Sequence, residues 1–349
     1  MLEQFPRCTL PRQQLITASE VAAIVGVSPW QTAHDVWANK RNPKQQETAA
    51  MRRGTAAEDV IHVWFEENGY DNNAPLQVEA GLRYADAPLQ GPLPWMGASP
   101  DAFAVDQDMA MYTVEYKTSA QPWFGGIPPH YLVQVRWQLL CVPTAAYAVL
   151  IGVTDLPPSV DALLGDENEF TRQAGKLVLS ILLGRGVMTP QVYVVQRNHE
   201  EEQALLRQVS DWYERHIVLD IEPELQAKDL IAVQRTWMAL EAPNTIEVDD
   251  DIDGGKFSRL AADLAAADAT AKEAEDAAKK ARAELLSYWA SNYGTAEVAL
   301  LPGGGKVSYK SQAGRASIDA DRLRKDHPQL AAEYTTQGAP FRTLRFSKK

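Results

Sequence analysis

The segment from Met111 to Lys117 constrains this chain more than any other stretch of the sequence. Its residues, Met-Tyr-Thr-Val-Glu-Tyr-Lys, alternate with the period of a β-strand and include β-branched and aromatic side chains. Because successive side chains of a strand point to opposite faces of the sheet, Glu115 and Lys117 project from the same face. The fold must therefore include a strand that presents a carboxylate and an ammonium group side by side.

An earlier strand-like segment, about 96 to 105, contains a second acidic residue, Asp101. The residues around 106 to 108 indicate a turn between this segment and the one that ends at Lys117. A hairpin of the two strands would bring Asp101 and Glu115 to the same end of the sheet. We therefore expect two carboxylates and one ammonium group to share a pocket.

These side chains suit the hydrolysis of a phosphodiester. Carboxylates can bind divalent ions, which lower the pKa of a water molecule and hold the attacking and leaving oxygens. Lys117 can orient the water or stabilise the developing charge. A third carboxylate would complete the site, and Glu58 is the candidate, on a helix expected after Gly54. A glycine at that position would let the backbone approach the site closely.

The kinds of metal site that this chain can build are limited by its few sulfur and imidazole ligands. It has two cysteines, Cys8 and Cys141, and six histidines without ligand spacing. These numbers exclude a disulfide framework and a cysteine-rich zinc or iron–sulfur site. Oxygen ligands would have to hold any metal, which favours Mg²⁺, with Mn²⁺ as the alternative, as one or two ions.

Composition limits the class of protein more loosely. With 349 residues, 45% hydrophobic and 23% charged, the chain is long enough for a sizeable core and an appendage. It has no apolar run long enough to span a membrane and no signal peptide at its start, so we expect a cytoplasmic protein. The net charge of −12 argues against broad non-specific binding of nucleic acid. A nuclease needs only a local basic strip beside its cleft.

Residues 1 to about 220 are expected to form one mixed α/β domain. The expected helices are about 20–25, one that opens at Ser28-Pro29, 56–67, 131–140 and 200–216. The expected strands are about 76–84, 96–105, 111–117, 146–153 and 191–196. This order predicts an α/β or α+β core with a central sheet covered by helices.

Residues 221 to 349 are expected to form a mostly helical extension with a small hairpin. The expected elements are an acidic connector (220–253), an Ala-rich helix (256–291), strands 298–301 and 306–309 around a glycine turn, a helix (318–333) and a last strand (341–346). The Ala-rich helix is either exposed or one half of a helical hairpin with 225–240. It would serve as a structural arm or spacer, or as an oligomerisation arm, because alanines allow close helix packing.

Five short blocks of sequence together resemble a known family. Asp101 with Glu115-Tyr116-Lys117 is similar to the PD-(D/E)xK nuclease signature. The blocks, in chain order, are Ile16–Glu20, Arg53–Glu58, Gly97–Asp101, Val114–Lys117 and Tyr131–Gln138. In this order they resemble the phage lambda exonuclease, or YqaJ-like, viral recombinase family. The resemblance implies a restriction-endonuclease-like core with a mixed central sheet flanked by helices.

The resemblance also implies roles for individual residues. Glu58, Asp101 and Glu115 would be metal ligands together with the main-chain carbonyl of Tyr116, and Lys117 would assist the attacking water. Gln134 would contact the scissile region or order the active site. Gln138 stands where related RecB-like nucleases carry a tyrosine, which fits the lambda-like branch better.

Contacts to DNA are expected from a second group of residues. Arg12, Ser19 and Ser99 match positions that form a pocket for a 5′-terminal phosphate in the family that this chain resembles. Ser19 could instead only cap a helix. Arg53, with its neighbour Arg52, could bind DNA phosphates, or the two could be a solvated pair. Trp123 could be a wedge at the end of the duplex.

The function implied by the resemblance is a 5′–3′ exonuclease that degrades linear double-stranded DNA from 5′-phosphorylated ends and leaves 3′ single strands for recombination. Its partners would be double-stranded DNA ends and a single-strand annealing recombinase, and it would assemble as a ring-shaped homo-oligomer. Two alternatives remain open. One is a structure- or sequence-directed endonuclease on the same fold, and the other is a non-catalytic scaffold that binds DNA ends.

Overall fold

The computed structural model of the chain describes residues 5–42, 47–68, 82–83, 88–106, 108–230, 248–249, 254–294, 296–302, 305–310 and 319–335. The chain divides into two compact units, Met1–Val233 and Gln234–Lys349. Within the described ranges, no helix is long and apolar enough to cross a membrane.

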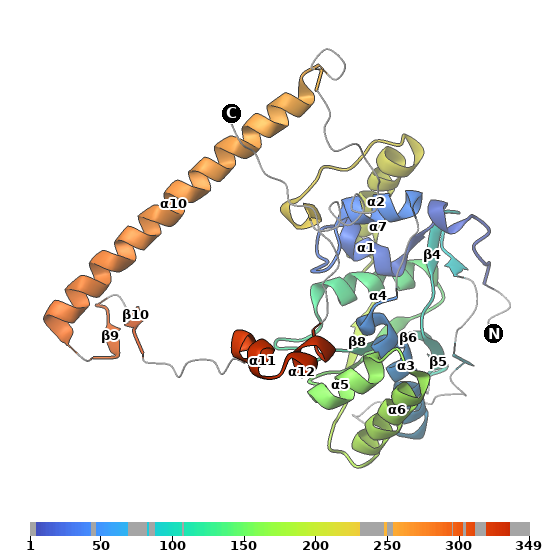
Figure 1. The fold of residues 1–349 in the computed structure, drawn as a ribbon. Helices are drawn as coiled ribbons and strands as arrows, with labels where there is room; N and C mark the ends of the chain where they lie inside the picture. The colour runs from blue at the N-terminus through green and yellow to red at the C-terminus, as the bar shows by residue number, and fades with distance from the viewer. Residues whose placement is uncertain are drawn as a thin grey trace. The chain divides into compact units, whose positions relative to one another are not determined.

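A five-stranded mixed sheet forms the centre of the first unit (Figure 1). Its strands, in spatial order, are β2 (Leu82–Arg83), β5 (Ala102–Val105), β6 (Met111–Thr118), β7 (Tyr147–Val153) and β8 (Gln191–Gln196). Strand β6 pairs antiparallel with β5 and parallel with β7, and β7 pairs antiparallel with β8. A smaller sheet joins β1 (Ile16–Thr17), β4 (Met96–Ala98) and β3 (Leu89–Gln90).

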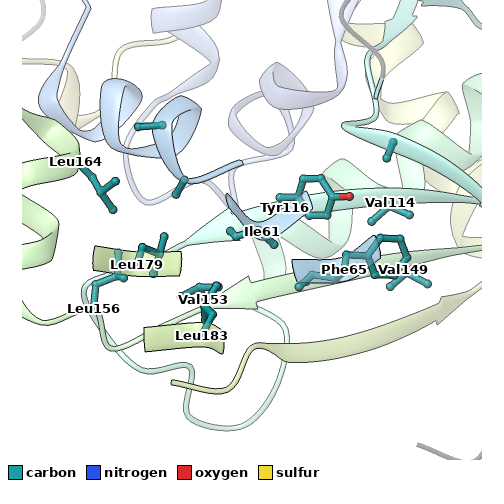
Figure 2. Close-up of a cluster of buried hydrophobic side chains, with 14 of the residues drawn as sticks. Ile61, Phe65, Val114, Tyr116, Val149, Val153, Leu156, Leu164, Leu179 and Leu183 are labelled. Carbon is teal, nitrogen blue, oxygen red and sulfur yellow. The ribbon is translucent and has the colours of Figure 1, made fainter. Parts of the chain in front are cut away.

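Helices cover both faces of the central sheet. On one face, α3 (Ala49–Asn68), α5 (Pro158–Gly165) and α6 (Glu169–Gly184) pack on Val114, Tyr116 and their neighbours of β7 (Figure 2). On the other face, α4 (Pro129–Cys141) packs on alternate residues of β5 and β7. The middle of β6 is consequently buried on both faces. The expected mixed α/β fold is confirmed, and so is the position of the segment that ends in Glu115 and Lys117.

The remaining helices of the first unit surround the small sheet. They are α1 (Ala18–Ile24), α2 (Ala33–Arg41) and α7 (His199–Tyr213), which is followed by a short π-helix (Glu214–Val218). Buried residues of α1, α4 and α7 share one core cluster, which includes Trp137 and Val209. Short 3₁₀ helices cover Arg12–Gln14 and Ala227–Asp229.

The second unit contains the long helix α10 (Lys256–Tyr293), the antiparallel strands β9 (Val298–Leu300) and β10 (Lys306–Ser308), and helices α11 (Ala320–Asp326) and α12 (Pro328–Glu333). Trp289 of α10 is buried and donates its indole N–H to the carbonyl of Ala296 (2.9 Å), which ties the end of the helix to the hairpin. The Ala-rich helix and the hairpin thus follow the expectation.

Several expected boundaries were wrong, each for a local reason. Helix α2 begins at Ala33 and not at Ser28-Pro29, because the Thr32 hydroxyl accepts the N–H of Asp35 (3.0 Å) and caps the helix there. Helix α3 begins at Ala49, so Gly54 lies inside it. The expected strand 96–105 is two strands that belong to different sheets.

Two helices were missed, and one expected helix is divided. No helix was expected at α5 or α6, although Pro158 at the first turn of α5 is a usual helix start. The expected helix 318–333 is interrupted at His327, because the residue before Pro328 avoids the helical conformation. The expected strand 341–346, most of 76–84 and residues 231–240 of the expected hairpin helix lie outside the described residues.

Candidate functional site

The hairpin of β5 and β6 places Asp101 directly opposite Glu115. Ala102 pairs with Val114, and the N–H of Asp101 donates to the carbonyl of Val114 (3.0 Å). The side chain of Asp101 turns back onto β6, where its Oδ2 accepts the N–H of Tyr116 (2.7 Å). Two carboxylates from consecutive strands therefore meet at one end of the sheet.

Glu115 is held by donors on both of its carboxylate oxygens. The side chain is buried, with 3% of its surface exposed. Its Oε1 accepts hydrogen bonds from the Lys117 ammonium and from Nε2 of Gln134 (2.5 Å), and its Oε2 accepts one from Nε2 of Gln138 (2.6 Å). Gln134 and Gln138 are four residues apart on α4, so both face the strand. Three donors hold this carboxylate in one fixed orientation.

Glu58 contributes to the electrostatics of the site from α3. Partial burial raises the pKa of Asp101 well above its usual value, and the charges of Glu115 and Glu58 raise it further. Lys117 and the hydrogen bond from Tyr116 act in the opposite direction. Burial alone would lower the pKa of Lys117, but the charges of Glu115 and Asp101 outweigh it and raise that pKa overall. Three carboxylates and one ammonium group therefore interact, with negative charge in excess.

The donor set fits a hard cation. The carboxylates that act on Asp101, those of Glu115 and Glu58, offer only oxygen ligands, and with Asp101 they outnumber the single ammonium group of Lys117. Within the described part of the chain, no three His, Cys, Asp or Glu side chains are already gathered as a metal cage. A cation bound here would therefore need the main chain, water or substrate to complete its ligands, as Mg²⁺ sites commonly do.

The expected role of Gly54 was wrong. A Cβ atom built on Gly54 meets no atom within 4 Å, so its lack of a side chain serves no close approach to the site. Glu58 is instead positioned by the packing of α3, since the neighbouring Ala57 is fully buried against the sheet.

Arg53, one turn before Glu58 on α3, has a partner within the protein. Its guanidinium donates to Oδ1 of Asp161 on α5 (2.5 Å), which ties the two helices together. This ion pair would have to open before Arg53 could contact a DNA phosphate. Its participation in DNA binding stays a prediction.

The residues expected to bind a 5′-phosphate lie along the small sheet. Strands β1 and β4 are parallel, with Thr17 opposite Gly97, so Ser19 and Ser99 follow at the same end of the two strands. Both serines and Arg12 are exposed. Ser19 does not cap α1. The Glu20 carboxylate closes that end by accepting the N–H of Thr17 (2.9 Å).

A buried lysine supports this edge of the small sheet. The ammonium of Lys40 donates to both oxygens of Glu20 (2.6 and 2.8 Å) and to the carbonyl of Arg12 (3.1 Å). The segment that carries Arg12 is therefore attached to α1 and α2. The assignment of a phosphate pocket stays a prediction.

The aromatic side chain available at the site is not the one expected. The Trp123 ring packs against Tyr131 and Tyr193, and a Cβ atom on Gly152 would lie 2.5 Å from it, so Trp123 belongs to the core. The next residue, Phe124, is 91% exposed. Lys117 lies 5.5 Å from the centre of the Tyr131 ring on α4, and Tyr131 in turn contacts Trp123, the residue before Phe124.

Gln138 is the residue whose part in the site the sequence did not reveal. It is fully buried, and it holds the second oxygen of Glu115. The one signal in the sequence was its spacing of four from Gln134, which places both glutamines on the same face of the expected helix. That spacing could have predicted that Gln138 contacts the site together with Gln134.

The fold and the site together define a class of protein: a mixed α/β domain with an acidic, lysine-bearing site at the end of a central β-hairpin. Residues 10–146 match the family model of the YqaJ-like viral recombinase domain. This matched range includes every residue assigned above to the candidate site. No curated protein matches the chain in sequence.

Solved structures with some similarity to the chain include two exonucleases. One is the alkaline exonuclease LHK-Exo from Laribacter hongkongensis, with 16% identity and a TM-score of 0.35, over 60% of this chain and 92% of that one. Another is a phage-related exonuclease from Haemophilus somnus 129PT, with 12% identity and a TM-score of 0.37, over 59% of this chain and 96% of that one.

Proposed function

We propose that the protein is a metal-dependent deoxyribonuclease whose active site consists of Glu58, Asp101, Glu115 and Lys117. The observation that carries this proposal is the meeting of Asp101 and Glu115 at the end of the β5–β6 hairpin, with the Lys117 ammonium bonded to Glu115. A protein that only bound DNA would have no reason to gather negative charge where a phosphate must lie.

The side chains divide the work of phosphodiester hydrolysis. Asp101, Glu115, Glu58 and the main-chain carbonyl of Tyr116 would hold Mg²⁺, which when bound supplies an acidified water and neutralises charge on the phosphate. Lys117 orients that water or stabilises the charge that develops on the phosphate oxygens. Gln134 and Gln138 keep the Glu115 carboxylate in place through its two oxygens.

We propose further that the substrate is the 5′-phosphorylated end of linear double-stranded DNA, degraded in the 5′–3′ direction to leave a 3′ single strand. Arg12, Ser19 and Ser99 would bind the terminal phosphate. The position of Ser19 and Ser99 at one end of the small sheet, and the exposure of all three side chains, support this role. In this proposal a single-strand annealing recombinase receives the 3′ single strand. The enzyme assembles as a ring-shaped homo-oligomer and works in the cytoplasm. Residues 1–220 form the nuclease domain, and residues 221–349 form its extension.

The direct test is the digestion of end-labelled duplexes with Mg²⁺ and with Ca²⁺. We expect release of mononucleotides from 5′-phosphorylated duplex with Mg²⁺, slower release from 5′-hydroxyl duplex, and little with Ca²⁺. Asp101→Ala and Lys117→Ala should each lower the rate at least a hundredfold, since each removes a group that acts on the reacting phosphate. Full activity in both folded variants would refute the site.

A covalently closed circular duplex separates the exonuclease from an endonuclease on the same fold. An end-dependent enzyme leaves the circle intact, whereas an endonuclease nicks it. A non-catalytic scaffold would bind DNA ends with and without metal and release no nucleotides from any of these substrates.

A further inference from the structure

Helix α10 carries an apolar seam with the spacing of a coiled coil. Apolar side chains recur along it at alternating intervals of three and four residues. Phe257, Leu260 and Leu264 begin this seam, Leu285 and Tyr288 end it, and the five seam positions between them are alanines. The helix has 38 residues, which corresponds to a length of about 57 Å at 1.5 Å per residue.

Most side chains of this seam are exposed among the described residues of the second unit, and Leu264 is half-buried. Leu260 is 58% exposed, Leu285 47% and Tyr288 61%, and the alanines between them are exposed as well. The hairpin of β9 and β10 is tied to the end of α10 through Trp289, and it leaves Leu285 and Tyr288 open. A long helix with one exposed apolar stripe gains most of its stability by burying that stripe against another helix.

The seam is self-complementary when a second copy runs in the opposite direction. In an antiparallel pair centred on the helix, Phe257 faces Tyr288, and Leu260 faces Leu285 of the second copy. Leu264 faces Ala281, and the other layers pair alanine with alanine. Bulky side chains thus meet at both ends, and small ones let the helices approach closely in the middle. The two-fold axis makes each contact occur twice.

The charges beside the seam favour this direction. In the antiparallel pair, Asp268 lies beside Arg282 of the second copy, and Lys256 beside Glu284, each contact twice by symmetry. A parallel pair would instead set Asp263 beside Asp268 with no compensating contact. One like-charge contact occurs at the centre of the antiparallel pair.

That central contact is between Glu275 and the same residue of the second copy. Lys279 on the same helix already lies 2.8 Å from Glu275, which reduces the repulsion. A shallow hollow borders the end of the seam and is lined by Ala283, Glu284, Ser287, Tyr288, Ser291 and Asn292. Charge and side-chain size therefore agree on one partner.

We propose that α10 pairs with α10 of a second copy of this chain in an antiparallel, two-fold symmetric coiled coil. This interface is separate from the candidate nuclease site and does not depend on the proposed activity. It joins two chains, or two rings if the first unit also assembles into a ring.

The first test compares the mass of the full chain in solution with that of a seam variant. Leu260→Asp combined with Leu285→Asp places charges in the seam and should halve the mass measured by sedimentation equilibrium. The matched control, Ala262→Asp with Ala269→Asp, adds the same charge on the opposite face of α10 and should keep the parent mass. A monomeric parent, or a seam variant with the parent mass, would overturn the proposal.

A charge exchange tests the same interface without disturbing the apolar seam. Asp268→Arg or Arg282→Asp alone should raise the dissociation constant of the pair roughly ten-fold, because two attractions become two repulsions. The double variant exchanges the two charges and should restore the parent affinity. If the double variant is as weak as the single ones, these residues do not face each other and the proposed pairing is wrong.

Cysteine crosslinking determines the direction of the helices. A mixture of chains carrying Leu260→Cys and Leu285→Cys should crosslink on oxidation, above the background of the parent chain. Neither variant alone should do so, since in an antiparallel pair identical positions would lie roughly 37 Å apart along the axis. Crosslinking in either variant alone, or none in the mixture, contradicts the antiparallel arrangement.

Discussion

The orientation of one carboxylate, Glu115, depends on three neighbours that come from two elements. Lys117 is on its own strand, whereas Gln134 and Gln138 approach from α4 on the same face of the sheet. A buried acceptor that loses a donor is costly, because neither water nor another group replaces the lost hydrogen bond. We therefore treat Gln138 as a positioning residue, since it is fully buried and contacts Glu115.

Gln138→Leu should weaken the binding of Mn²⁺ and the nuclease rate together, by about 10–100-fold, as expected for residues that orient a metal ligand. Isothermal titration with Mn²⁺ measures the first quantity independently of turnover. The matched control is Thr113→Val. Thr113 is as fully buried as Gln138 and lies on the same face of β6 as Glu115. Its hydroxyl has no hydrogen-bond partner among the described residues. A folded Gln138→Leu variant with unchanged Mn²⁺ affinity would show that Glu115 does not need this donor.

The loop between β6 and α4 contains two adjacent aromatic residues, Trp123 and Phe124, of which the first is packed and the second is exposed. The Trp123 ring lies over Gly152 of β7, where no larger residue fits, and it packs between Tyr131 and Tyr193. Phe124 points away from the core, and Gly125 and Gly126 follow it with φ of +90° and +106°. These left-handed conformations favour glycine and turn the chain back toward α4.

Phe124→Ala should weaken the binding of a blunt duplex, measured with Ca²⁺, by about 1–3 kcal/mol if the ring stacks on a terminal base pair. The free energy of unfolding should not change, because the side chain is 91% exposed. Trp123→Ala should instead lower the free energy of unfolding by about 3 kcal/mol, because it removes a packed ring. Phe170→Ala, at an 84% exposed position on α6, is the control for a general loss of surface aromatics. Equal duplex affinity in Phe124→Ala and Phe170→Ala would exclude the stacking role.

Across the whole chain, the segment that follows α7 belongs with the first unit. Asp229 is buried, and it accepts a hydrogen bond from the Thr32 hydroxyl and another from the N–H of Gln226 (2.6 Å). Glu222 lies 2.9 Å from the ring of His34 on α2. A domain that ended at residue 220 would leave the polar groups of α2 without these partners.

A chain that ends at Val233 should therefore be more stable than one that ends at residue 220. The loss of buried polar contacts corresponds to about 2 kcal/mol, and for a unit of this size that lowers the melting temperature by roughly 4–8 °C. Differential scanning calorimetry of the two shortened chains measures the difference. Equal melting temperatures would place the boundary at 220, as the sequence indicates.

The sequence was sufficient wherever the signal was local. Alternation identified β6, and its spacing of two placed Glu115 beside Lys117. A run of alanine, lysine and glutamate identified α10, because helix propensity acts residue by residue. The expected turn at 106–108 brought Asp101 to the same site, since a hairpin between neighbouring segments needs no information from distant parts of the chain.

Packing between distant segments decided the rest. Which side of α4 meets β6 determines that Gln138 holds Glu115. The contact between α3 and α5 determines that Arg53 is paired with Asp161. The return of residues 220–229 onto α2 sets the extent of the first unit. The burial and pairing of a side chain depend on which surfaces meet in three dimensions. The periodicity of one segment does not predict which distant segments will pack against it.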